Sequence, residues 1–197
     1  MDQTFAIKQI QERIALYEDM QAYTHLYKLL AEGLQRFSYS MVRSNEVAEE
    51  IVSDVFIKVW QIRGKLMEID NLKVYLYTIA KNFSLNYINR NYKSTTISLD
   101  ALDVEAVIEI NGPAEMCISA DLVNQIRRVI RQLPPQCRLI VQLVKEEGLQ
   151  YKEVAAILDI SPLTVRNQLA IGVRKIGEAL PAYLQSSIPF LTKFSTS

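Results

Sequence analysis

The chain has 197 residues, 49% of them hydrophobic and 22% charged, which is enough for one large or two small domains with packed interiors. Its 22 lysines and arginines balance its 22 aspartates and glutamates, and no apolar run approaches the roughly 20 residues that span a bilayer. Because the sequence also lacks a basic and apolar leader, we expect a cytoplasmic protein rather than a secreted or membrane-spanning one.

The first third of the sequence shows apolar residues at helical spacing. We predict helices over residues 4–18, 20–43 and 46–63, and the start signals Ser44 and Asn45 precede the third of these.

The third helix has an apolar side and a charged side. Phe56 and Trp60 lie four residues apart on the apolar side and are predicted to pack in the core. Asp54 and Lys58 on the other side form either a solvated ion pair or part of an interface with a partner.

A long helix is predicted from Asn71 to Asn91, after a loop over residues 64–70. The stretch from residue 71 to 93 has no acidic residue, although basic and aromatic residues alternate along it. Its predicted core stripe consists of Leu72, Leu76, Ile79 and Phe83.

Beside the core stripe, a second sector of this helix, called the wedge, carries side chains that can stack on bases or form hydrogen bonds. Such groups, flanked by cations, suit bases that have been drawn out of a duplex. A helix buried on two sides, with polar residues in the gaps, would show the same composition. The wedge contains Tyr75, Thr78, Asn82, Asn86 and Asn89, and the flanking cations are Lys73, Lys81, Arg90 and Lys93.

The charge is distributed unevenly along the chain. Residues 1–93 carry a net charge of +1, residues 94–126 carry −6 and residues 127–197 carry +5. We therefore expect an acidic linker over residues 94–112, which negative charge would keep off DNA phosphates.

Two further helices are predicted beyond this linker. One runs over residues 113–133 and ends at Pro134, and a shorter one passes through Leu139 and Leu143 and ends at Gly148. The tail over residues 181–197 is expected to be weakly ordered.

Residues 151–176 read as a short helix, a tight turn and a longer helix. Ser161 is predicted to cap the second helix and Pro162 to occupy its first position. Its core-facing stripe lies opposite a basic, amide-bearing face, as in a helix that enters the major groove, although a capped amphipathic helix of a bundle would look similar. The core-facing stripe contains Val165, Leu169, Gly172, Val173, Ile176 and Leu180, and the outer face contains Arg166, Asn167, Ala170, Ile171, Arg174 and Lys175.

The sequence contains no set of residues typical of a catalytic centre. Cys117 and Cys137 lack the paired spacing of a zinc site or a disulfide framework, and six scattered glycines offer no phosphate-binding loop. His25 has no carboxylate or cysteine partner in helical register. We therefore expect no enzyme activity, cofactor, metal or small-molecule substrate.

Three stretches, in this order, resemble an extracytoplasmic-function (ECF) sigma factor of the sigma-70 family, which directs bacterial RNA polymerase to promoters. The family's polymerase-binding helix resembles AEEIVSDVFIKVWQ, and its −10 region resembles LKVYLYTIAKNFSLNYINR. Its −35 domain resembles IRQLPPQCRLIVQLVKEEGLQYKEVAAILDISPLTVRNQLAIGVRKI.

This resemblance implies an all-α fold of two small helical domains joined by the acidic linker. Residues 1–93 would bind polymerase and melt the −10 element, and residues 113–180 would hold the helix-turn-helix. The partners implied are promoter DNA, core RNA polymerase through its β′ clamp helices and β subunit, and an anti-sigma factor.

The resemblance also assigns roles to individual residues. Those implied to bind polymerase are Glu50, Asp54, Phe56, Lys58, Trp60 and Gln61, with Phe56 and Trp60 mainly supporting the fold. Those implied at the −10 element are Asn71, Lys73, Tyr75, Thr78, Lys81, Asn82, Asn86, Asn89, Arg90 and Lys93, and the loop over residues 65–71 would hold a displaced base. Those implied at the −35 element are Thr164, Arg166, Asn167, Gln168, Ala170, Ile171, Arg174 and Lys175.

Departures from the family pattern prevent a direct transfer of promoter preference. Asn86 stands where many relatives have Asp, and Gln168 and Ile171 stand where some have Arg. Since Asn167 suits adenine while Ala170 and Ile171 suit thymine methyls, we predict an A·T-leaning −35 site.

The alternative function is a stand-alone helix-turn-helix regulator that binds duplex DNA without polymerase.

Overall fold

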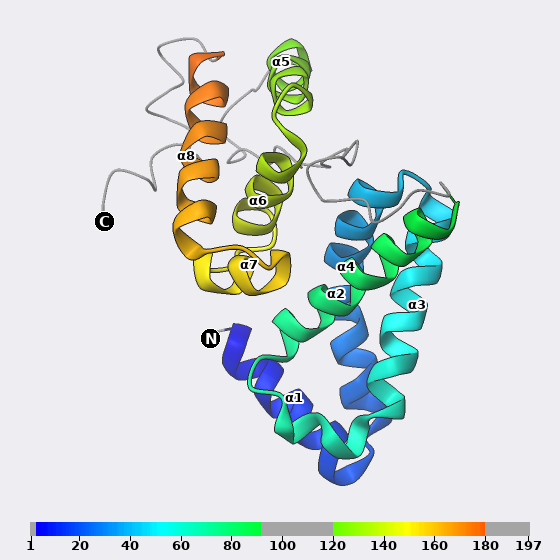
Figure 1. The fold of residues 1–197 in the computed structure, drawn as a ribbon. Coiled ribbons are helices and arrows are strands. Elements are labelled where there is room, and N and C mark those ends of the chain that lie inside the picture. Colours follow the sequence, from blue (N-terminus) through cyan, green and yellow to red (C-terminus); the bar gives the residue numbers. More distant parts are fainter. Residues whose placement is uncertain (1–2, 92–119, 180–197) are drawn as a thin grey trace. The chain divides into compact units, whose positions relative to one another are not determined.

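The computed structural model describes residues 3–91 and 120–179, and all regular structure in these two ranges is helical. The described helices fall into two compact units, one with α1 to α4 and one built mainly from α5 to α8 (Figure 1). The predicted acidic linker (94–112), Lys93, Cys117 and the tail (181–197) lie outside the described residues. The same is true of the predicted domain boundaries.

The first unit contains four α-helices, and their bounds agree with the predicted ones to within two residues. They are α1 (Gln3–Tyr17), α2 (Met20–Val42), α3 (Asn45–Gln61) and α4 (Leu72–Asn91). The segment predicted as a loop before α4 instead contains the 3-10 helix η1 (Arg63–Glu68). The backbone amides of Lys65 and Ile69 donate to the carbonyls of Ile62 and Leu66, three residues earlier, as this tighter helix requires.

Side chains cap the beginnings of these helices. The Asp19 carboxylate accepts hydrogen bonds from the amides of Gln21 (2.8 Å) and Ala22 (3.0 Å) at the start of α2. The bond from Ala22, followed by that from Arg13, lowers the pKa of the Asp19 carboxyl. Ser44 caps α3 as predicted, since its Oγ accepts from the Val47 amide.

Apolar side chains from all four helices fill the core of the first unit. Leu34 and Phe37 of α2 are fully buried, and the Phe37 ring lies 5.4 Å from the ring of Tyr77 on α4. Complete burial of one such side chain stabilises the fold by about 1.5–3 kcal/mol. The other core residues of this unit include Ile14, Leu26, Ala48, Val55, Val59, Leu66, Leu72 and Leu76.

The predicted core stripe of α4 is only half right. Leu72 and Leu76 are buried, but Ile79 and Phe83 are half-buried. The buried line continues instead through Tyr77, Ala80, Ser84 and Ile88. Helix α4 packs against α2, α3 and α1, so burial on several sides blurs the one-sided pattern that the prediction assumed.

The second unit contains α5 (Ala120–Arg131), α6 (Pro135–Lys145), α7 (Tyr151–Leu158) and α8 (Pro162–Glu178). Gly148 follows α6 with φ of +65°, a conformation that glycine adopts without a steric penalty. All seven residues from Cys137 to Leu143 are buried, so α6 is the central helix of this unit.

Helices α6 and α8 approach closely at a glycine. A β-carbon on Gly172 of α8 would lie 2.7 Å from Cγ2 of Val141 and 3.1 Å from Sγ of Cys137, both on α6. The Cys137 thiol also donates to the backbone carbonyl of Gln168 on α8 (3.2 Å). Burial raises the pKa of this thiol, so it stays protonated and can donate. Gly172 therefore allows α8 to pack closely against α6.

Candidate nucleic-acid and polymerase interfaces

The turn between α7 and α8 is held by local hydrogen bonds. Asp159 adopts a left-handed conformation (φ 58°) and ends α7, and its amide donates to the carbonyl of Ala155. Ser161 Oγ then accepts from the Thr164 amide (3.0 Å), and Pro162 opens α8 as predicted. The cap and the proline fix where α8 begins, and thereby which side chains face outward.

Helix α8 divides into a buried side and an exposed side. Of the predicted core-facing stripe, Val173 is half-buried and Leu180 lies outside the described residues, while Val165, Leu169, Gly172 and Ile176 are buried. The predicted outer face is exposed over its whole length, at Arg166, Asn167, Ala170, Ile171, Arg174 and Lys175. Thr164 and Gln168 are half-buried at its edge.

One exposed residue of this face was missed in the sequence. Leu163, near the start of α8, has 63% of its surface exposed. It lies three and four residues before Arg166 and Asn167, so it belongs to the same face. Its spacing from Asn167 was the signal that would have identified it, and it extends the apolar character of Ala170 and Ile171 toward the helix start.

Cations at the far end of α8 are exposed. Nε of Arg174 lies 3.8 Å from Oε1 of Glu178, and both side chains are about 70% exposed. An ion pair in such an environment contributes little and breaks easily. Arg174 is therefore accessible to a phosphate at little energetic cost.

Helix α4 presents its polar groups from a half-buried setting. Asn82, Asn86 and Arg90 are exposed, as the predicted wedge requires. The remaining described members of the predicted set are half-buried: Asn71, Lys73, Tyr75, Thr78, Lys81 and Asn89.

Two members of the set also serve the helix itself. Oδ1 of Asn71 accepts from the Val74 amide (3.1 Å) and caps α4. The Thr78 hydroxyl donates to the carbonyl of Val74 (2.9 Å). Their local bonds fix the start of α4 and the orientation of the wedge.

The charged side of α3 forms a continuous exposed strip. Glu50, Asp54, Lys58 and Gln61 are exposed, and Ile57, 53% exposed, lies on the same strip. Ile57 was not predicted, although it stands three residues after Asp54 and four before Gln61. This strip could bind a partner through both charged and apolar contacts.

Phe56 and Trp60 support this strip from beneath. Phe56 is only 2% exposed and contacts the rings of Tyr23 (6.1 Å) and Tyr27 (4.8 Å) on α2. Trp60 is half-buried between Tyr23, whose ring lies at 5.1 Å, and the guanidinium of Arg63, at 4.9 Å. Desolvation raises the pKa of Tyr23, whose hydroxyl donates to the Phe56 carbonyl (2.9 Å).

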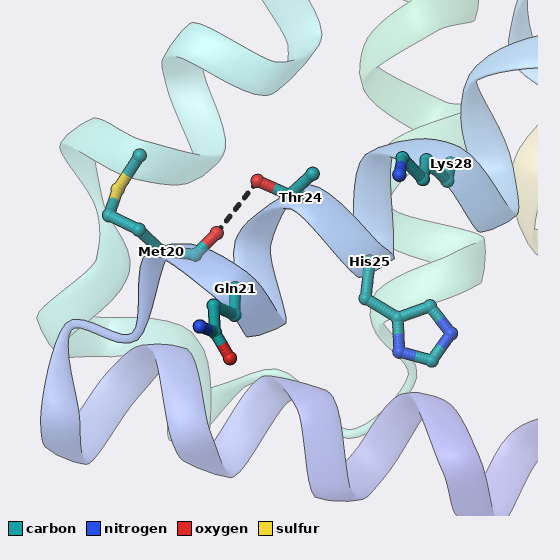
Figure 2. A pocket seen from close by; sticks show the side chains of 5 residues that line it. All are labelled: Met20, Gln21, Thr24, His25 and Lys28. Atoms are coloured by element: carbon teal, nitrogen blue, oxygen red, sulfur yellow. Dashed lines mark hydrogen bonds between the residues drawn. The ribbon is translucent and has the colours of Figure 1, made fainter.

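A shallow pocket of about 450 Å³ lies on α2 and is lined in part by His25. In Figure 2, Gln21, His25 and Lys28 line it beside Met20 and Thr24, whose hydroxyl donates to the Met20 carbonyl. None of the lining residues is a carboxylate or a cysteine, and His25 is an exposed surface residue. Within residues 3–91 and 120–179, no group of three or more His, Cys, Asp or Glu is placed to hold a metal ion.

None of the helices in the described ranges has both the length and the hydropathy needed to cross a membrane.

Comparison with known families accounts for both units. The model of sigma-70 region 2 matches residues 26–94, and the model of sigma-70 region 4 matches residues 124–176. Together these models match more than half of the chain, in the order in which a sigma factor carries the two regions. The chain belongs to the sigma-70 family.

Its relatives within that family are ECF sigma factors. The chain is 29% identical to the ECF RNA polymerase sigma-E factor of Escherichia coli K12 over 127 residues, which are 61% of this chain and 66% of that protein. It is 23% identical to the ECF RNA polymerase sigma factor SigM of Bacillus subtilis over 144 residues, which are 73% and 86% of the two chains.

Two solved structures share the fold. CnrH in complex with the cytosolic domain of CnrY matches with a TM-score of 0.54 and 16% identity, over 88% of this chain and 96% of that one. The sigma factor RpoE in complex with the anti-sigma factor NepR from Bartonella quintana matches with a TM-score of 0.55 and 18% identity, over 81% and 97%. These structures confirm the predicted all-α fold, and the matches to sigma-70 regions 2 and 4 confirm the predicted family.

Proposed function

We propose that this protein is an ECF sigma factor that binds core RNA polymerase and directs it to promoters by reading their −10 and −35 elements. The observation that carries the proposal is the order of the two matched regions, each with its own set of polar side chains, half-buried or exposed on α4 and mostly exposed on α8. A stand-alone regulator would need no region 2, so that alternative is not favoured. The protein would act in the cytoplasm as a regulator without catalytic activity of its own.

The first unit, proposed to span residues 1–93, would open the −10 element. Tyr75 offers a stacking surface, and Asn82 and Asn86 offer donors and acceptors to the edges of unstacked bases. Because residues 71–93 contain no carboxylate, a phosphate backbone meets no repulsion along α4.

The second unit, proposed to span residues 113–180, would read the −35 element in the duplex. Asn167 can pair with N6 and N7 of an adenine, and Leu163, Ala170 and Ile171 suit thymine methyls. Arg174 and Lys175 would contact phosphates, which position α8 without reading the sequence. Selection of bound sequences from a random pool would test this preference, and a G·C-rich winner would contradict it.

The exposed strip on α3 would bind the polymerase. Glu50, Asp54, Ile57, Lys58 and Gln61 would meet the β′ clamp helices, while Phe56 and Trp60 hold the strip in shape from beneath. The second unit would contact the β subunit. Residues 94–112 would act as the linker and residues 181–197 as a tail.

An anti-sigma factor is the proposed regulator. RpoE from Bartonella quintana is bound to the anti-sigma factor NepR in the similar structure, and CnrH is bound to the cytosolic domain of CnrY. We propose that this chain is held inactive by a partner of that class.

Transcription in vitro tests the proposed function directly. Purified core polymerase is supplied with template DNA, with and without this chain, and transcripts are mapped to their start sites. Specific initiation that depends on the chain is the expected result. Failure to associate with core polymerase, combined with footprinting of a duplex site by the chain alone, would overturn the proposal in favour of a stand-alone regulator.

A further inference from the structure

The segment between α3 and α4 is held in place by α1, a helix that precedes the matched region 2 (residues 26–94). Gln11 lies on the buried side of α1, between Ile10 and Ile14, and only 4% of its surface is exposed. A polar residue on an apolar stripe must satisfy its hydrogen bonds inside the protein. The partners of Gln11 therefore indicate why it is there.

Both partners are backbone carbonyls at the end of η1. Nε2 of Gln11 lies 2.5 Å from the carbonyl oxygen of Leu66 and 2.7 Å from that of Ile69. The side-chain amide nitrogen carries two hydrogens, one for each carbonyl, so one side chain bridges the last turn of η1 and the residue after it. The Leu66 carbonyl also accepts the amide of Ile69 (3.0 Å), so Gln11 reinforces the bond that closes this turn.

A second contact ties the start of η1 to the end of α1. Nη2 of Arg63 lies 3.1 Å from Oε1 of Glu18, and Nη1 of Arg63 donates to the Trp60 carbonyl (3.1 Å). Glu18 is 62% exposed, so this ion pair is weakened by solvent. The buried Gln11 is therefore the stronger of the two attachments.

We propose that Gln11 is a positioning residue for base recognition: by bridging the carbonyls of Leu66 and Ile69, it sets the path of residues 65–71 where a displaced promoter base is held. The inference rests on the proposed function and on the resemblance to ECF sigma factors, which implies that residues 65–71 hold a displaced base. Lys65, Glu68 and Asp70 are exposed on the segment, so its backbone path determines where their side chains meet the base. Without the two bonds, the turn loses one buried and one partly buried contact to its carbonyls and can open locally.

The test compares two substitutions on the buried stripe of α1. Gln11→Met keeps the length and packing of the side chain but removes both donors, while Ile14→Val removes one methylene from a fully buried neighbour and leaves the η1 contacts intact. Hydrogen exchange at the amides of Lys65 and Ile69 is measured in the full chain. We expect about ten-fold faster exchange or more in Gln11→Met, and no change at these amides in Ile14→Val.

Base preference is measured with holoenzyme on templates that carry each base at every −10 position. Gln11→Met is expected to lower discrimination at a single position by about five-fold or more, the size of one lost base contact, with −35 preference unchanged. A general loss of activity that leaves the ranking of bases intact, or an equal loss of discrimination in Ile14→Val, would overturn the inference. If Gln11→Met does not fold, Gln11→Asn, which has an amide with a shorter reach, is measured with the same two outcomes.

The design separates this inference from the proposed function. Promoter-dependent transcription by the unmodified chain tests the proposed function alone. Faster exchange at Lys65 and Ile69 without altered base preference overturns only the role of Gln11.

Discussion

Helices α4 and α8 are both proposed to meet DNA, yet they are embedded in their units in different ways. The outer face of α8 is exposed at all six of its predicted residues and most of the described core stripe is buried, whereas most polar residues of α4 are half-buried. A helix that rests on its unit by one side can enter a groove of the duplex. A helix with neighbours on several sides offers only a narrow strip, which suits single bases brought to it.

The largest expected effect is a loss of stability of the first unit, whose core contains the buried side of α4. Tyr77→Ala removes a fully buried ring that contacts Phe37, and should lower the free energy of unfolding of the first unit by about 3–5 kcal/mol. Urea unfolding, followed by the fluorescence of Trp60 in that unit, measures the loss.

Tyr75→Ala is the matched control on the same helix. Tyr75 is half-buried, so its loss should cost far less stability while weakening binding to −10 single strands. Equal costs for the two substitutions would contradict the division of α4 into a core side and a wedge.

The next effect concerns base recognition. Asn167→Ala should reduce discrimination at one A·T pair of the −35 element by about 1–3 kcal/mol, because it removes a bidentate contact with adenine. Competition binding of holoenzyme to duplexes with single base changes measures it.

Asn86→Ala on α4 provides the reciprocal control. It should leave −35 preference unchanged and weaken capture of the non-duplex −10 strand, because Asn86 is exposed on the wedge. If Asn86→Ala altered −35 preference, the assignment of the two elements to separate helices would be wrong.

The contrast between the two helices also explains what the sequence could predict. One-sided burial produces a clean period of 3.6 residues, so the cap at Ser161, the buried Val165 and Leu169 and the exposed Arg166 were all predicted correctly. On α4 helical spacing predicted Ile79 and Phe83 as core residues instead of Tyr77, because burial on several sides removes the period.

Contacts between distant segments left no periodic signal. The bridge from Gln11 to Leu66 and Ile69 spans more than 50 residues, and only a polar residue on an apolar stripe hinted at it. The close approach of Gly172 to Val141 was equally invisible, because a glycine on a core stripe does not identify its neighbour.

A smaller effect on stability tests how closely α8 packs against α6. Gly172→Ala gains about 1 kcal/mol of helix propensity, but its β-carbon would lie 2.7 Å from a methyl of the stiff, buried Val141. Since overpacking costs about 1–3 kcal/mol, we expect a net loss of about 1 kcal/mol in the stability of the second unit. Thermal unfolding of the full chain measures it.

A double-mutant cycle with Val141→Ala identifies the cause. Removing the Val141 methyl groups should abolish most of the cost of Gly172→Ala, since the 2.7 Å clash is gone, the gain in propensity remains and only the 3.1 Å approach to Sγ of Cys137 is left. If the two losses simply add, the helices are not in contact through this glycine.

The smallest effect appears in the salt dependence of binding rather than in the strength of folding. Lys175→Ala on α8 should reduce the slope of log affinity against log salt by about 0.9 on duplex −35 DNA, the value for one phosphate on B-form DNA. Lys81→Ala on α4 should reduce the slope by about 0.7 on −10 single strands, because a single strand condenses fewer counterions.

The control is Lys28→Ala, at an exposed lysine on α2, which should change neither slope. If both lysines contact phosphates, Lys175→Ala changes the slope on duplex DNA only and Lys81→Ala changes it on single strands only. Base preferences stay unaltered, because phosphate contacts position the protein without reading the sequence. Loss of slope on duplex DNA in Lys81→Ala would instead mean that α4 meets the promoter before it opens.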